Sequence, residues 1–127
     1  MKLILKLLEG RYAVCRLDTG APVPLALLAG THEFVSVTRT ADELSVVCAE
    51  PLAPAGAKTE HGWRAFKVQG PLDFSLTGVL SSLLGPLAEA KISVFTVATF
   101  DTDYILVREA ELAAATAVLK QHAELLK

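Results

Sequence analysis

The hydrophobic pattern of residues 70–107 predicts a loop, a helix, a strand, a tight turn and a second strand. One set of apolar side chains recurs every three or four residues, which places it on a single helix face: Leu76, Val79, Leu80, Leu83, Leu84 and Leu87. The run Ile92–Thr99 then becomes β-branched and aromatic, which is typical of a strand. Asp101–Asp103 interrupts this run, and Tyr104–Val107 predicts the returning strand.

Similar patterns elsewhere predict five more strands: Lys2–Leu8, Tyr12–Leu17, Phe34–Thr38, Glu43–Cys48 and Trp63–Gln69. The first two of these are separated by Glu9-Gly10, so they could form a hairpin. Pro24–Leu28 allows at most a turn or two of helix. The alanine-rich stretch Glu109–Leu126 predicts a strong final helix.

Two proline-containing stretches predict interruptions. Gly85-Pro86 lies inside the helix of residues 76–87, where proline lacks an amide hydrogen and predicts a break or a kink. Residues 50–60 hold two prolines and a glycine among few large apolar groups, which makes them the best linker candidate.

The two halves of the chain share an internal pattern of strand, polar turn and strand. Aligning residue 34 with residue 95 matches Phe34 with Phe95, Thr38 with Thr99, Asp42 with Asp103, Leu44 with Ile105 and Val46 with Val107. Chance could give such matches in an apolar, β-branched background, but the shared order of elements favours two β-α-β-β units. Only the second unit has a full first helix and a second helix.

Composition indicates a packed globular chain, because apolar residues make up 52% and charged residues 20% of it. Basic residues are scattered and the formal net charge is −2, which argues against nucleic acid as a partner. The apolar run Leu3–Leu8 is interrupted by Lys6 and is too short for a signal peptide. We therefore expect a cytoplasmic protein that does not insert into a membrane.

Candidate chemistry is sparse. His32, His61 and His122 share no spacing with one another or with cysteine, so we expect no metal site and no cofactor. Cys15 and Cys48 fall in separate apolar strands, which favours two buried thiols over a disulfide. No nucleophile motif or phosphate-binding loop is present, and we expect no enzymatic activity.

The C-terminal half resembles the ACT domain family. Thr77-Gly78-Val79-Leu80 at a helix start, followed by residues 90–95 (AKISVF), carries the resemblance, and residues 93–107 are similar to the tandem-ACT group that includes the CASTOR arginine sensors. The resemblance implies an α+β fold of two interlocked ferredoxin-like units (βαββαβ), with antiparallel sheets and helices on one face. It implies domains at residues 1–60 and 61–127.

The chain departs from that pattern, since an ACT unit needs a fourth strand after its second helix and the final helix is expected to reach residue 126. We hypothesise that Lys2–Leu8 fills this edge of the C-terminal sheet. The N-terminal unit has no convincing second helix, which leaves sheet surface in need of cover. A homodimer would supply it.

Two segments are expected to form a ligand site: the loop of residues 70–79 and the turn of residues 99–103. The glycines allow close backbone approach, and free amides at a helix start favour a carboxylate. The expected contacts are Gly70, Pro71, Leu72, Thr77, Gly78, Val79, Ile92, Ser93, Thr99, Phe100, Asp101 and Asp103.

Each of these contacts also has a structural interpretation. Asp103 could neutralise the ammonium group or a basic side chain of the ligand, or Asp101–Asp103 could only shape the turn. Gly70-Pro71 could be an ordinary turn, Gly78 could only let the helix pack on the sheet, and Ser93 could simply face solvent.

Together these features predict a regulatory or sensor module that binds an amino acid or a similar small effector. The alternative is a ligand-free ACT-like protein that dimerises or docks on a partner enzyme.

Overall fold

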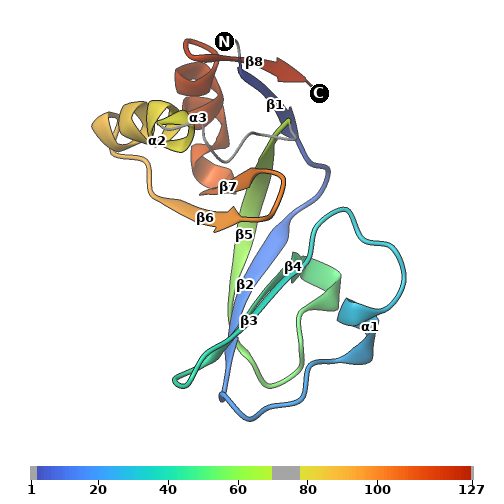
Figure 1. Ribbon diagram of the computed structural model, residues 1–127. Coiled ribbons are helices and arrows are strands. Elements are labelled where there is room, and N and C mark those ends of the chain that lie inside the picture. Colours follow the sequence, from blue (N-terminus) through green and yellow to red (C-terminus); the bar gives the residue numbers. More distant parts are fainter. Residues whose placement is uncertain (1–2, 70–77, 127) are drawn as a thin grey trace. The chain divides into compact units, whose positions relative to one another are not determined.

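The computed structural model of the 127-residue chain describes residues 3–69 and 78–126 (Figure 1). The chain divides into two compact units. We call Gly10–Trp63 the contiguous unit, and Met1–Glu9 together with Arg64–Lys127 the discontinuous unit. The long strand β5 (Lys58–Val68) crosses this boundary, so it supplies residues to both units.

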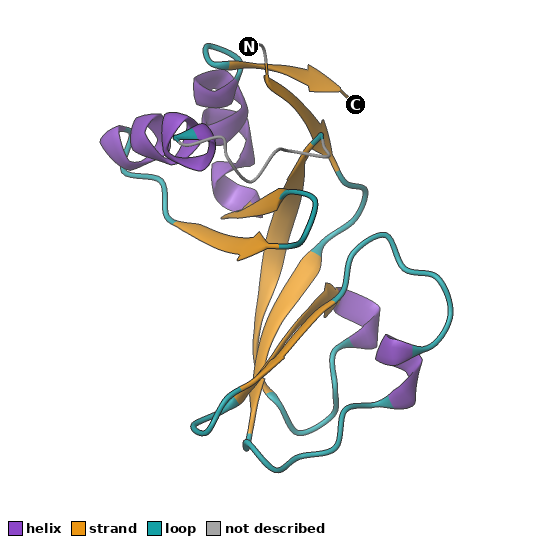
Figure 2. Ribbon diagram, viewed as in Figure 1, coloured by secondary structure: helices purple, strands orange, loops and turns teal. Residues whose placement is uncertain are grey.

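The contiguous unit is a sheet of antiparallel strands with little helix (Figure 2). Its elements are β2 (Tyr12–Leu17), α1 (Leu25–Leu28), β3 (Ser36–Arg39), β4 (Leu44–Ala49), the 3-10 helix η1 (Glu50–Leu52) and the first part of β5. The strand order is β3-β4-β2-β5. Side chains from β2, β4 and α1 form its core: Ala13, Cys15, Leu27, Leu44, Val46 and Cys48.

The discontinuous unit combines the second part of β5 with elements from both ends of the chain. These are β1 (Leu3–Leu7), α2 (Val79–Glu89), β6 (Val94–Ala98), β7 (Asp103–Arg108), the 3-10 helix η2 (Glu109–Glu111), α3 (Leu112–Leu119) and β8 (Ala123–Leu126). β7 pairs with β6 and β5, β5 pairs antiparallel with β1, and β1 pairs parallel with β8.

The two helices α2 and α3 pack on one face of this sheet (Figure 1). Their buried leucines and alanine share a core with apolar residues of β1, β5 and β7: Leu5, Phe66, Val68, Leu83, Leu87, Ile92, Ile105, Val107, Ala115 and Leu119. The three-and-four spacing of α2 therefore buries Leu83 and Leu87 completely, as the pattern predicts. The predicted α+β class with antiparallel sheets is confirmed, with the β1–β8 pair as a parallel exception.

Three predictions about elements are wrong. β1 does not form a hairpin with β2, because β1 pairs with β5 and β8 while β2 pairs with β4 and β5. The final helix ends at Leu119, and residues 123–126 form β8, so a strand does follow the second helix. Of the break or kink predicted at Gly85-Pro86, the break is wrong, since α2 continues through Pro86 to Glu89.

The predicted linker is also wrong, because residues 50–60 belong to the body of the contiguous unit. Leu52, Ala53 and Ala57 pack against its core, and β5 already begins at Lys58. Apart from Leu52, small apolar residues supply this packing, so the stretch has few of the large side chains that mark an ordered segment.

Candidate functional site

The turn of residues 99–102 is closed by its own threonines. The amide of Thr99 donates to the carbonyl of Thr102 at 2.8 Å, and the Thr99 hydroxyl donates to the same carbonyl at 3.1 Å. The amide of Thr102 donates back to the Thr99 hydroxyl oxygen at 3.2 Å. Since a threonine hydroxyl that bonds backbone groups mimics a turn, Thr99 fixes the shape of the loop between β6 and β7.

Thr102 ties this turn to the end of β5. Its side chain is only 6% exposed, and its hydroxyl donates a short hydrogen bond of 2.5 Å to the carbonyl of Val68. Val68 is the last residue of β5, which leads towards the predicted ligand loop. Thr102 thus fixes the turn to the C-terminal end of β5.

The residues between the two threonines face outward. Phe100 is 81% exposed and Asp101 is exposed, whereas Asp103 is half-buried at the start of β7 opposite Ala98. Thr99, Phe100, Asp101 and Asp103 therefore come from one rigid hairpin, as the sequence predicts. Thr102 was missed, because a threonine in a polar turn is expected to be exposed.

The other predicted segment is described only at its helical end. Gly70, Pro71, Leu72 and Thr77 lie outside the described residues. Gly78 precedes α2 with φ +76°, and its carbonyl accepts hydrogen bonds from the Ser82 amide at 2.9 Å and the Ser81 hydroxyl at 3.1 Å. A Cβ added to Gly78 would meet only the Ser81 hydroxyl oxygen at 3.7 Å, so the backbone conformation requires glycine here and close packing does not. Val79 is the first residue of α2.

Ile92 and Ser93 follow α2 and have opposite environments. The helix ends with bonds from the Ile92 amide to the Leu87 carbonyl (3.0 Å) and from the Lys91 amide to the Ala88 carbonyl (2.9 Å), the pattern of a Schellman motif. Ile92 is 6% exposed and packs in the core with Leu87. Its side chain is therefore a core side chain, while Ser93 is exposed.

The hairpin of β3 and β4 repeats the construction of the hairpin of β6 and β7. The Thr40 amide donates to the Glu43 carbonyl at 2.9 Å, and the Thr40 hydroxyl oxygen accepts from the Asp42 and Glu43 amides at 3.1 Å each. Thr40 therefore corresponds to Thr99, and Asp42 to Asp101.

This correspondence corrects the sequence alignment, which matched Asp42 with Asp103. The last pair before the turn is Arg39 with Leu44 in one hairpin and Ala98 with Asp103 in the other, so Leu44 takes the place of Asp103. Strand residues alternate with a period of two, and apolar matches alone cannot distinguish registers that differ by one period.

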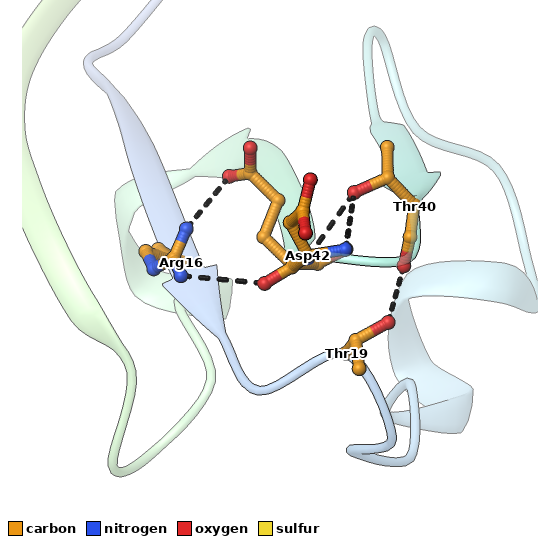
Figure 3. A network of polar contacts seen from close by, with 5 residues as sticks. Arg16, Thr19, Thr40 and Asp42 are labelled. Carbon is orange, nitrogen blue, oxygen red and sulfur yellow. Dashed lines mark hydrogen bonds and ion pairs between the residues drawn. The ribbon is translucent and has the colours of Figure 1, made fainter.

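In the contiguous unit, side chains attach the loop after β2 to this turn (Figure 3). The Thr19 hydroxyl donates to the Thr40 carbonyl, and Arg16 donates to the Asp42 carbonyl at 3.3 Å and pairs with Glu43 at 3.4 Å. Arg39 donates to the carbonyls of Thr19 and Ala21. No local motif in the sequence marks Arg16 or Arg39, because both act on residues distant in the chain.

Glu50 is the centre of another polar group in the contiguous unit. Its carboxylate accepts a hydrogen bond from the Gly62 amide at 2.7 Å and pairs with Arg11 at 3.0 Å and His61 at 3.4 Å. The Gly62 hydrogen bond lowers the pKa of the Glu50 carboxyl, Arg11 and His61 add to this effect, and burial opposes it. Gly62 has φ +80° beside a register shift between β2 and β5, so Glu50 holds an irregularity of β5 in place.

The two cysteines are free, buried thiols, as the sequence favours. Burial, and secondarily Cys15, raises the pKa of Cys48 to about 12. Among the described residues, no group of three or more His, Cys, Asp or Glu side chains could hold a metal ion. No described helix has the length and hydropathy needed to cross a membrane.

Comparisons with known proteins agree with this architecture. A family model described as ACT domain matches residues 58–121, and a model of an N-terminal domain matches residues 10–55. A crystal structure of an Agobacterium tumefaciens protein is 39% identical, with a TM-score of 0.88, and the match covers 99% of this chain and 93% of that one. The regulatory subunit of aspartate kinase from Thermus thermophilus shares the fold, with a TM-score of 0.64 at 11% identity and a match covering 92% of this chain and 95% of that one.

The chain is also similar to the human cytosolic arginine sensor for mTORC1 subunit 1. The two are 36% identical over 63 residues, which are 49% of this chain and 19% of the sensor. The chain thus spans about a fifth of the length of this curated relative. The matched residues 58–121 contain β5, α2, the threonine-closed turn and α3, and the chain belongs to the ACT domain family.

Proposed function

We propose that this chain is a regulatory module that binds an amino acid at the discontinuous unit. The observation that supports this most is the turn of residues 99–102, which Thr102 fixes to the end of β5 while Phe100 and Asp101 face outward. The similarity to an arginine sensor supports an amino acid as the effector.

In this proposal Asp103 is the counter-charge for the ligand. It is half-buried at the first position of β7, next to a turn whose backbone cannot easily rearrange. A carboxylate that is partly shielded from water interacts more strongly with a cation than an exposed one does. Asp103 would therefore bind the ammonium group or a basic side chain, and the loop of residues 70–79 would receive the α-carboxylate.

Binding alone does not regulate anything, so the ligand must bind two states with different affinity. We propose a cytoplasmic homodimer in which ligand binding changes the interface or the affinity for a partner protein. The module would have no catalytic step of its own.

A thermal-shift screen of the proteinogenic amino acids tests this proposal. We expect one amino acid to raise the melting temperature, Asp103→Asn to remove the shift, and the exposed Glu89→Gln to retain it. Asp101→Asn distinguishes the two carboxylates, because a ligand held by Asp103 should still bind this variant. The absence of a shift with any amino acid in the millimolar range would count against the proposal.

A second function is a ligand-free module that docks on another protein. The exposed Phe100 at the tip of the hairpin favours this alternative, because large exposed aromatic side chains often serve as binding anchors. A pull-down from cell extract with and without added amino acids separates the two. A partner that binds regardless of amino acids, and that Phe100→Ala releases, would favour docking.

A further inference from the structure

Two basic residues face each other across β2 and β5 of the contiguous unit. The strand register places Arg16 directly opposite Lys58, and both side chains are exposed. Like charges at directly opposed positions destabilise a sheet. An anion placed between them would remove this repulsion.

The pair borders an open depression of about 340 Å³. Arg16, Leu17, Asp18 and Ala21 line it from β2 and the following loop, and Ala55, Gly56 and Lys58 line it from the start of β5 and the residues before it. Pockets that hold small molecules begin at about this volume, and a few placed charges among apolar groups are typical of them.

Arg16 is held in a fixed position at this depression. One guanidinium nitrogen donates to the Asp42 carbonyl at 3.3 Å, and the other pairs with the Glu43 carboxylate at 3.4 Å (Figure 3). Asp42 and Glu43 belong to the turn closed by Thr40, so the guanidinium is anchored to a rigid hairpin. Since Arg presents five donors, these two contacts leave others for a ligand.

Lys58 differs from Arg16 in its contacts. Within the described part of the chain, the ammonium group of Lys58 makes no ion pair or side-chain hydrogen bond. Of the two basic residues at the depression, Arg16 pairs with Glu43 and Lys58 does not, so Lys58 would contribute most of the attraction for an anion.

We propose that this depression binds a small monocarboxylate, with the carboxylate between Lys58 and Arg16. Asp18 limits the charge of the ligand, because its own carboxylate lines the same depression and would repel a doubly charged anion. A singly charged carboxylate is therefore expected to bind better than hydrogen phosphate. This site is independent of the one proposed at residues 99–103.

The experiment is an amide-resolved NMR titration of the full chain with acetate and lactate, at constant ionic strength. We expect saturable shifts of the Ala21, Ala55, Gly56 and Lys58 amides. Lys58→Gln should weaken binding about tenfold, because it removes a charge-assisted contact. Phosphate should produce smaller shifts at the same concentration.

Lys67→Gln is the matched control. Lys67 also lies opposite a lysine, Lys6, across β5 and β1, but it does not line the depression. This variant should retain the shifts at full size. Equal losses in both variants would indicate a general charge effect, and linear shifts without saturation in the wild-type chain would overturn the proposal.

Shifts confined to the amides of Thr99–Asp103 would also overturn it, because they would place the carboxylate at the other proposed site. Conversely, saturable shifts at Gly56 without any at Thr99–Asp103 would support this site even if no amino acid binds at residues 99–103.

Discussion

Lys91 holds a backbone conformation that side chains other than glycine rarely adopt. Its φ of +61° follows from the Schellman motif that ends α2, in which the next residue, Ile92, turns back into the core. Left-handed backbone costs an ordinary residue about 1–2 kcal/mol. The same turn buries Ile92 against Leu87, and this burial offsets the cost of the strained backbone.

We predict that Lys91→Gly stabilises the protein. Glycine adopts the left-handed conformation without strain, although its greater freedom in the unfolded chain offsets part of the gain. The free energy of unfolding should rise by about 0.5–1 kcal/mol in urea denaturation. Lys120→Gly is the control, because Lys120 ends α3 with φ −60° and should lose stability. A decrease in both variants would contradict the strain argument.

The polar contacts of Glu50 predict that stability depends on pH. Its pKa is lowered in the folded state, so its contribution to stability is present above its ordinary pKa and is lost as pH falls through the folded value. The wild-type chain should therefore exceed Glu50→Gln in stability at neutral pH, and the difference should shrink between about pH 5 and pH 3.

Denaturation midpoints across this pH range check the prediction, with the exposed Glu89→Gln as control. A wild-type advantage over Glu50→Gln that stayed constant down to pH 3 would show that the lost contact is not electrostatic.

Among the elements, β8 shows how tertiary contacts override local propensity. Its residues, Ala123–Leu126, are good helix formers, and they continue an alanine-rich run that predicts one long helix. The structure instead pairs them with β1, from Leu3 opposite Ala123 to Lys6 opposite Leu126. The partner strand lies at the other end of the sequence, and local periodicity contains no information about it.

We predict different costs for two adjacent leucines of β8. Leu125 packs against the core of the discontinuous unit, whereas Leu126 is exposed. Leu125→Ala should lower the free energy of unfolding by about 2 kcal/mol, the lower end for a core leucine. Leu126→Ala should change it by less than about 0.5 kcal/mol. Similar costs for both would fit a helix end better than a strand.

Sequence reasoning succeeded where the pattern was local. β2, β6 and β7 were predicted because β-branched and aromatic runs bounded by turn residues mark strands well, and the Thr99–Asp103 turn was found between two of them. It failed where a residue acts through a distant partner. Thr102 bonds to Val68, and Arg16 meets Lys58 only through the register of β5.

On the scale of the whole molecule, the discontinuous unit takes residues from both ends of the sequence. The core of the discontinuous unit includes Leu5 from β1 together with residues after Arg64. The division into domains at residues 1–60 and 61–127 is a prediction that fragments of the chain can test.

We predict that a fragment of residues 61–127 is unfolded by circular dichroism, because it lacks β1 and leaves Phe66 and Val68 without Leu5. Adding a peptide of residues 1–9 should restore cooperative unfolding. The same peptide with Leu5→Asp is the control and should not, since a charge would enter a fully buried position. A stable, cooperative 61–127 fragment without peptide would favour the simple division.

The pairing of β1 with β8 also orders events during synthesis. The contiguous unit lies in one stretch of chain, so it can fold as soon as residue 63 has left the ribosome. β1 precedes the other described elements in the sequence, yet its parallel neighbour β8 follows all of them. The hydrophobic strand Leu3–Leu7 therefore stays unpaired along one edge until residues 123–126 emerge, and an unpaired edge of this kind makes a folding intermediate prone to aggregation.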